Sequence, residues 1–396
     1  MVRKKAAALR PPKGMKRAIG LECFLFLGIF LLFFVLIGLK MGAANMLQTM
    51  MNTAYDLLMS TVFYIMALAV LAGAISALFA EFGVISLLNK ILSPLMRPLF
   101  GLPGASVLGV VTTYLSDNPA VLTLAEDAGF RRYFKKYQLP ALTNLGTSFG
   151  MGLIITTYIL GVQSPTGESF LGPALIGNLG AVVGAIISTR LMLRYTKKRF
   201  GTEAACNAET DQADDIRLRK VREGSVGSRF IDALLSGGKS GVSMGVAIIP
   251  GVLIICTLVM MLTYGPGEGG VYTGTAYEGV AVLPWIGEKL SFLLEPLFGF
   301  RSSAGIAVPI TALGAAGAAI GLIPGLVSGG LAGGNDIAVF TAMCMCWSGY
   351  LSTHVAMMDS LKYSELTGRA ILYHTIGGIC AGVSANLLYK LFFVIL

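Results

Sequence analysis

Seven apolar runs constrain the fold of this chain more than any other feature, because each is close to the length that crosses a bilayer. They lie at residues 19–39, 61–79, 139–162, 171–193, 241–262, 337–357 and 371–396. A transmembrane helix needs about 20 predominantly apolar residues. Hydrophobic residues make up 55% of the 396-residue chain and charged residues 13%, which is more apolar surface than one soluble core would bury. The sequence predicts an all-α polytopic membrane protein with about seven transmembrane helices.

The basic residues indicate which loops face the cytoplasm. Lys and Arg gather before the first run, between residues 90 and 136, between 194 and 222, and at Lys362 and Arg369, whereas the loops at 163–170 and 263–283 have none. This alternation is typical of the positive-inside rule, so it explains the net charge of +9 without a nucleic-acid partner. The first run is too long for a signal peptide and lacks a cleavage site. We expect a retained first helix, a cytoplasmic N-terminus and a loop at 40–53 outside.

An internal repeat is the most specific signal in the sequence. Residues 92–101 match residues 290–299 at seven of ten positions, and the same offset of 198 also aligns Thr143 with Thr341 and Phe149 with Trp347. The predicted topology places the first copy on the cytoplasmic face and the second on the outer face. The sequence therefore predicts two inverted-topology repeats, an arrangement common in secondary transporters.

Each repeat also contains an interfacial amphipathic helix, at about 84–100 and 284–298, and a broken hairpin. The arms of the first hairpin have about 12 to 15 residues each, enough for roughly half a bilayer, so both hairpins are expected to be re-entrant. The predicted organisation is a basic N-terminus with the first helix (1–53), a first repeat (54–196) with hairpin 102–130, a charged cytoplasmic linker (197–232), and a second repeat (233–396) with hairpin 300–334.

The tip of the first hairpin is the leading candidate for a substrate site. It consists of Ser116, Asp117, Asn118 and Pro119. A chain broken at membrane depth persists only where it is buried in protein or lines a cavity, and Pro119 starts an arm whose N-terminal N–H groups suit a carboxylate or hydroxyl. Capping of that arm by Asp117 and Asn118 is the alternative. The second tip, at 314–317, holds only Gly and Ala.

Polar residues at helical spacing in the spans that follow the hairpins are further candidates. They are Thr143, Asn144, Thr147 and Ser148 in the first repeat and Thr341, Ser348 and Ser352 in the second. Such a stripe marks the face turned away from lipid, with Asn144 the best candidate for a substrate contact. Hydrogen bonds between helices would use the same side chains, so both interpretations stay open.

Ionisable groups offer a route for coupling to Na⁺ or H⁺. The candidates are Asp117, Asp336, His354 and Asp359, with His354 and Asp359 close enough in sequence for a proton relay. Simple solvation of the aspartates is the alternative. Neither a catalytic set, a metal-ligand spacing nor a cofactor fingerprint occurs, and the six cysteines form no CxxC pair. We therefore expect no enzyme, no cofactor and no bound metal.

The first repeat resembles a known family of membrane domains. Its amphipathic helix is followed by Pro-Leu-Phe-Gly-Leu-Pro at 98–103 and a polar break, Ser-Asp-Asn-Pro-Ala, at 116–120. This succession resembles the nucleoside recognition, or Gate, domain family, which includes spore maturation proteins A and B and the Gate regions of ferrous-iron and concentrative nucleoside transporters. The resemblance covers 55–195 and, more weakly, 236–396. It implies a permease of the bacterial inner membrane that holds substrate near Ser116–Pro119. The second repeat lacks the polar tip.

These observations favour a secondary transporter that moves a small polar metabolite, such as a nucleoside, amino acid or small carboxylate, by alternating access. Its expected partners are that substrate and the lipid bilayer, with a homo-oligomer left open. One alternative is a non-transporting assembly or signalling component that docks through 194–232. Another is a metal-ion permease, for which Cys344, Cys346 and Asp117 make the case.

Overall fold

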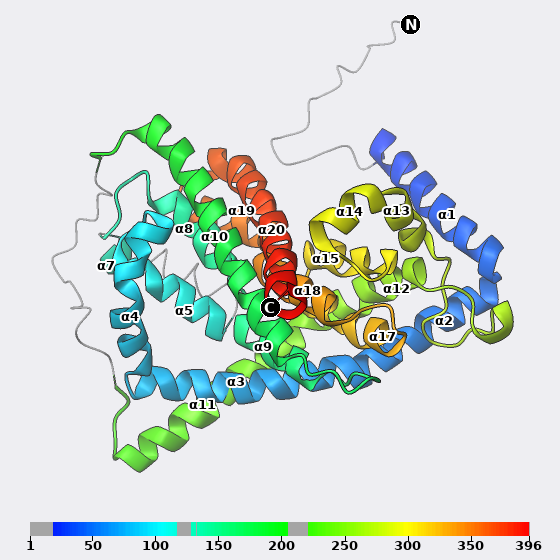
Figure 1. Ribbon diagram of the computed structural model, residues 1–396, viewed down its shortest axis with the longest axis horizontal. Helices are drawn as coiled ribbons and strands as arrows, with labels where there is room; N and C mark the ends of the chain where they lie inside the picture. Colours follow the sequence, from blue (N-terminus) through cyan, green and yellow to red (C-terminus); the bar gives the residue numbers. More distant parts are fainter. Residues whose placement is uncertain (1–18, 117–127, 132, 205–220, 396) are drawn as a thin grey trace, which may run out of the picture.

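The computed structural model describes residues 19–116, 128–131, 133–204 and 221–395, and all regular secondary structure in these ranges is helical (Figure 1). Within the described ranges, five helices are long and apolar enough to cross a bilayer. They are Leu21–Met41 (α1), Ala43–Glu81 (α2, η1 and α3 in series), Leu171–Phe200 (α10), Val226–Thr263 (α11, η4 and α12 in series) and Ser364–Phe393 (η7, α20 and part of η8). The predicted all-α fold with several apolar helices is confirmed.

Three of the five long helices are series of consecutive helical segments, and shorter helices connect the five. The series consist of α2 (Ala43–Asp56), η1 (Leu57–Val62), α3 (Phe63–Glu81), α11 (Val226–Pro250), η4 (Gly251–Cys256), α12 (Thr257–Thr263), η7 (Ser364–Leu366), α20 (Thr367–Lys390) and η8 (Leu391–Ile395). The shorter helices of the first half are α4 (Val84–Leu95), η2 (Met96–Phe100), η3 (Gly104–Ser106), α5 (Val107–Leu115), α7 (Ala128–Arg131), α8 (Leu139–Thr147) and α9 (Gly152–Gly161). Those of the second half are η5 (Glu268–Gly270), α13 (Val282–Lys289), α14 (Ser291–Phe298), η6 (Ser303–Ile306), α15 (Ala307–Ala312), α16 (Ala316–Gly321), α17 (Ile323–Ser328), α18 (Gly334–Cys346) and α19 (Tyr350–Ser360).

The two longest series cross each other, and we call them the crossed pair. Gly73 of α3 lies against Gly237 of α11, while Gly241 lies against the Ala69 backbone and Gly245 against Met66. Residue numbers rise along one helix as they fall along the other, so the two helices are antiparallel. Small residues let helix backbones approach closely where lipid provides no hydrophobic driving force. The glycines of α11 therefore fix the contact that organises this part of the fold.

The backbone repeats with the same offset as the sequence. Three pairs of residues with positive φ are separated by 198 positions: Gly83 and Ala281, Gly101 and Gly299, Met151 and Gly349. The corresponding helices α10 and α20 pack antiparallel, because Gly180 meets Ala385 and Gly184 meets Gly377. The amphipathic helix α4 lies on one side of α10 and α20, and its equivalents α13 and α14 lie on the other (Figure 1). These relations agree with the expectation of inverted repeats.

The segment 40–53, expected to be a loop, is helical from Ala43 onward. Gly42, at φ 83°, turns the chain between α1 and α2, and α2 then continues through η1 into α3. The expectation was wrong because the polar residues of α2 form one stripe along the helix. That stripe binds the segment 264–281 rather than water.

Hydrogen bonds attach the 264–281 segment to α2 along its length. Asn45 Nδ2 donates to the Tyr272 carbonyl at 2.9 Å, and Asn52 Nδ2 donates to the Gly274 carbonyl at 2.8 Å. The Glu278 carboxylate is 2% exposed and accepts from two backbone N–H groups, those of residues 273 and 274 at 2.9–3.1 Å. It also accepts from the Thr49 hydroxyl at 3.4 Å. This carboxylate organises the segment against α2.

The opposite end of the crossed pair is held by charge. Glu81, at the end of α3, accepts from Arg222 Nη1 at 2.9 Å and from Arg229 Nε at 2.7 Å. Ser225 caps α11 by accepting from the Ser228 N–H at 3.2 Å. The predicted linker 197–232 therefore contains the end of α10 and the first turns of α11, and residues 205–220 lie outside the described ranges.

Neutralising Glu278 should weaken the attachment of the 264–281 segment to α2 and reduce the dependence of stability on acid pH. Burial raises the pKa of Glu278, but hydrogen bonds from Thr273, Gly274 and Thr275 outweigh burial and lower the pKa to about 2, from 4.5. Because the folded-state pKa is depressed, the stabilisation is complete above about pH 4.5 and is lost as the pH falls towards 2. We expect Glu278→Gln to cost about 1–3 kcal/mol, since buried N–H donors lose their acceptor.

Thermal unfolding in detergent between neutral pH and about pH 3 tests this prediction. The wild-type melting temperature should fall more steeply with acid than that of Glu278→Gln. Glu288→Gln serves as the control, because Glu288 is an exposed carboxylate of α13, outside the 264–281 segment. Parallel pH profiles for wild type and Glu278→Gln would contradict the proposed role.

Candidate functional site

Two of the apolar runs predicted as continuous spans are each broken near the middle. The run 139–162 forms α8 and α9, with Met151 at φ 55° between them, and the run 337–357 forms α18 and α19, with Gly349 at φ 56°. The equivalent positions of the two breaks identify them as a shared feature of both halves. The expectation of unbroken helices was wrong. Polar residues keep the same helical spacing before and after a one-turn break, so the sequence pattern does not reveal the break.

In each half, the end of a short helix lies against the break that follows it in the chain: the end of α5 in the first half, and the turn between α15 and α16 in the second. Tyr114, near the end of α5, packs so closely on Gly152 that a β-carbon there would collide with the tyrosine ring. In the second half, α15 ends and α16 begins around 313–315, and the Gly314 carbonyl oxygen lies 3.8 Å from where a β-carbon of Gly349 would be. In transporters, unpaired backbone groups at broken helices commonly bind the substrate. The structure thus pairs the end of α5 with one helix break and the α15–α16 turn with the other.

Asn144 joins three helices instead of facing an open space. Its side chain is fully buried, and its Nδ2 donates to the Ser188 hydroxyl of α10 at 2.9 Å and to the Ala370 carbonyl of α20 at 3.0 Å. Within the described part of the chain, its Oδ1 has no hydrogen-bond partner. These contacts favour the interhelical interpretation of Asn144, with Oδ1 left as the one group available to another ligand.

Two buried histidines extend this polar cluster. His374 Nε2 lies 2.5 Å from the Cys346 carbonyl oxygen, and its Nδ1 lies 3.3 Å from the Ser188 hydroxyl. The His354 ring lies beside it at a tilt of 54°, with ring centroids 4.6 Å apart, and its Nδ1 lies 2.8 Å from the Tyr350 carbonyl oxygen. The sequence singled out His354 but not His374, because the latter reaches the cluster from a helix that showed no other polar face.

Most other candidate hydroxyls bond within their own helix. Thr147, Ser148 and Thr341 donate to carbonyls four residues back at 2.7 Å, and Ser352 donates to Gly349 at 3.0 Å. Such bonds satisfy a hydroxyl without committing its lone pairs.

The two remaining hydroxyl candidates in these helices, Thr143 and Ser348, are buried. The Thr143 hydroxyl has no partner in the described ranges, so this side chain keeps its full bonding capacity.

The aspartates have separate surroundings. Asp336 is buried and accepts from the Arg301 and Gly333 N–H groups, each at 2.9 Å, so it caps the start of α18 and holds the second hairpin. Asp359 accepts from the Ser364 hydroxyl at 2.9 Å in an exposed position. Ser116 is exposed and lines a cavity of about 300 Å³ beside α3 and α11. Asp117, Asn118 and Pro119 lie outside the described residues.

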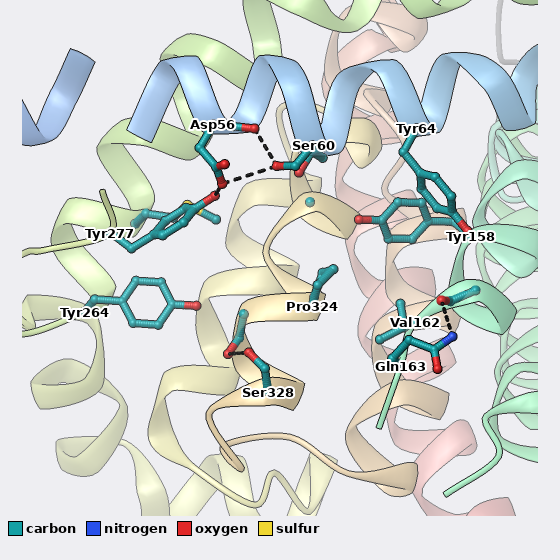
Figure 2. A pocket seen from close by; sticks show the side chains of 15 residues that line it. Asp56, Ser60, Tyr64, Tyr158, Val162, Gln163, Tyr264, Tyr277, Pro324 and Ser328 are labelled. Carbon is teal, nitrogen blue, oxygen red and sulfur yellow. Dashed lines mark hydrogen bonds between the residues drawn. The ribbon is translucent and has the colours of Figure 1, made fainter. Parts of the chain in front are cut away.

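A larger cavity, of about 630 Å³, lies where the crossed pair meets α9, α16 and α17 (Figure 2). Its lining residues are Asp56, Ser60, Thr61, Tyr64, Tyr158, Gly161, Val162, Gln163, Met260, Tyr264, Tyr277, Gly321, Pro324, Gly325 and Ser328. Analysis of the sequence missed this cavity. The spacing of Asp56, Ser60 and Tyr64, four residues apart on an apolar helix, was the signal that could have revealed it.

No group of three or more His, Cys, Asp or Glu side chains is gathered in the described ranges in a way that could hold a metal ion. The two cysteines suggested for a metal permease, Cys344 and Cys346, are buried in α18, and the Cys346 thiol lies 3.8 Å from the Ala181 carbonyl oxygen.

Comparison with solved structures shows the fold of a transporter. CNTnw, a concentrative nucleoside transporter, in an inward-facing substrate-bound state matches with a TM-score of 0.52 and 13% identity, over 94% of this chain and 85% of that one. A double variant of CNTnw in an outward-facing state matches with a TM-score of 0.51 and 13% identity, over 93% and 86% of the two chains. No protein-family model and no curated protein sequence matches the chain. At this identity, the likeness establishes a shared fold.

Proposed function

We propose that this protein is a secondary transporter that moves a small polar metabolite across a bilayer by alternating access. The observation that carries the proposal is the pairing of the end of α5 and of the α15–α16 turn with two broken helices, in a chain whose backbone turns repeat at one offset. A fold of this kind is compatible with both inward-facing and outward-facing states, since both have been described for CNTnw. Transport, rather than catalysis, is the activity such a scaffold performs.

The substrate proposed first is a nucleoside, with an amino acid or small carboxylate as the alternatives. A nucleoside transporter shares the fold, and the first half resembles the Gate domains. Ser116, Asp117, Asn118 and Pro119 remain the proposed contacts, together with the Thr143 hydroxyl and Asn144 Oδ1, which have no other partner in the described structure.

The proposed orientation places the N-terminus and the α4 end of the molecule in the cytoplasm. Basic side chains concentrate at that end, in α7, the last turn of α10 and the first turns of α11, in agreement with the positive-inside rule. The proposed membrane is the bacterial inner membrane, with the charged segment 197–232 joining the two repeats inside the cell.

Uptake by proteoliposomes tests the proposal. Wild-type protein should accumulate at least one of uridine, alanine and succinate under an inward Na⁺ or H⁺ gradient. Asn118→Ala should reduce that uptake about two- to tenfold, the cost of one lost hydrogen bond, whereas Ser164→Ala in an exposed loop should not. Absence of uptake for all three classes under both gradients would remove the proposal for these substrates.

A further inference from the structure

The 630 Å³ cavity is built like a ligand site, although it is separate from the hairpin tips. Its volume falls within the range of about 300–1,000 Å³ that is typical of small-molecule sites and exceeds by far what a single water needs. Residues of α9, α16, α17 and the crossed pair contribute to its walls, and the 264–281 segment closes one side (Figure 2). The cavity therefore lies at the meeting point of several independent elements.

The charge of the cavity comes from Asp56. Its Oδ2 accepts from the Tyr277 hydroxyl and from the Ser60 hydroxyl at 3.2 Å, whereas no hydrogen bond to Oδ1 occurs among the described residues. None of the lining residues is Lys, Arg or His. Burial, together with the adjacent Asp56, raises the pKa of Tyr277, so Tyr277 stays a donor to the Asp56 carboxylate. A carboxylate with one uncommitted oxygen and no basic neighbour in the wall favours a cationic ligand.

The walls beside Asp56 are aromatic. Tyr64 and Tyr158 pack edge to face with ring centroids 5.7 Å apart, and Tyr264 and Tyr277 do so at 6.4 Å. Figure 2 shows the two pairs on opposite sides of the cavity, with the Asp56 helix running above both. Aromatic rings attract ammonium groups through their quadrupole, and they also pack well against apolar bodies.

Glycines make room for two of these tyrosines. A β-carbon at Gly161 would collide with the Tyr64 hydroxyl, and one at Gly325 would lie 2.5 Å from the Tyr264 hydroxyl. The close packing on these glycines therefore holds the rings of Tyr64 and Tyr264 in place. The cavity is thus preorganised, which reduces the ordering cost of binding.

We propose that this cavity is a binding site for a small organic monocation with an aromatic or apolar body. The ammonium group lies beside Asp56 Oδ1, and the body lies between the two tyrosine pairs. Ser60, Ser328 and Gln163 line the same space and offer hydrogen bonds to polar substituents. Binding at this site is independent of the proposed transport, because no step of transport is needed to observe it.

Binding of phenethylamine and of 2-phenylethanol, measured by calorimetry on the full chain in uncharged phosphatidylcholine nanodiscs, tests the proposal. The two probes share an aromatic body, but only the amine is a cation at neutral pH. The amine should bind wild type at least about tenfold more tightly than the alcohol does, and Asp56→Asn should weaken amine binding by a similar factor, the value of a hydrogen bond to a charged group. Glu295→Gln, which removes a carboxylate from a different cavity, should leave amine binding unchanged.

A second variant keeps the test decisive if Asp56→Asn does not fold. Ser328 is exposed at the cavity edge, so Ser328→Trp should fill the space without altering charge and should abolish binding of both probes. The proposal is overturned if wild type does not bind the amine, if amine and alcohol bind equally, or if the amine binds Ser328→Trp as it binds wild type. Uptake by the same purified protein in proteoliposomes shows separately whether the transport proposal stands.

Discussion

Gly241→Ala is expected to destabilise the protein by about 3 kcal/mol or more, the upper end of the cost of overpacking a tight core. A β-carbon at Gly241 would collide with the Ala69 carbonyl and the Val70 backbone nitrogen of α3. Backbone atoms cannot rotate away as a side chain can, so the two long helices must separate. Gly237 and Gly245 make close contacts in the same antiparallel crossing, so separating the helices at Gly241 also increases the distances at these two contacts.

Gly238, one turn away on the same helix, provides a matched control whose substitution by alanine should not destabilise the protein. A β-carbon at Gly238 would lie 3.5 Å from Val70 Cγ1, which is ordinary van der Waals contact. Since alanine favours a helix over glycine by up to about 1 kcal/mol, Gly238→Ala should be neutral or slightly stabilising. Melting temperature in detergent and the monodisperse fraction on size exclusion measure both variants. Equal stability of the two variants would show that the crossing is not the close contact described.

The offset of 198 residues could be predicted from the sequence because the features it relates are local. Gly101 and Gly299 both end an amphipathic helix at positive φ, and glycine tolerates that conformation at little cost. Such a turn depends on a few adjacent residues, so it leaves a readable pattern. Helices also occur at both expected amphipathic segments, as α4 with η2 in the first half and α13 with α14 in the second.

The helix breaks could not be predicted because one of them depends on distant contacts. Met151 is a non-glycine residue at φ 55°, a conformation that its own type disfavours. The packing of Tyr114 on Gly152 lies beside it, and this contact spans almost forty positions of sequence. Local propensity alone would continue the helix through Met151.

The candidate site shows the same limit. Asn144 was singled out in the sequence as a candidate for a substrate contact. In the structure it is buried, and its partners Ser188 and Ala370 belong to helices that only the fold brings together. The stripe on α2 was taken for a loop for a related reason, because its binding partner is the 264–281 segment, more than 200 residues away. Polar character is visible in the sequence, whereas its use as a bond between helices is not.

Movement of the second hairpin against the crossed pair can be tested with one engineered cysteine. A β-carbon on Gly321 of α16 would lie 3.9 Å from the native Cys256 Sγ of η4 and 3.0 Å from Thr61 Cγ2. The β-carbons of a disulfide lie about 3.5–4.5 Å apart, and the Cys256 β-carbon is one C–S bond from its Sγ. A small rotation of the two side chains therefore brings the thiols into range, and we expect Gly321→Cys to cross-link to Cys256 under mild oxidation. If transport needs these two elements to move apart, oxidation should reduce uptake to background, and dithiothreitol should restore it.

Two controls separate tethering from damage in this experiment. Gly321→Ala makes the same tight contact with Thr61 Cγ2 but has no thiol, so its uptake should not respond to oxidant. Gly321→Cys combined with Cys256→Ser keeps the new thiol and removes its partner, so it too should be insensitive. Cross-linking is scored by loss of two alkylatable thiols in the intact mass. Full uptake by the cross-linked protein would mean that η4 and α16 stay together throughout the transport cycle, and the moving boundary would then have to lie between other helices.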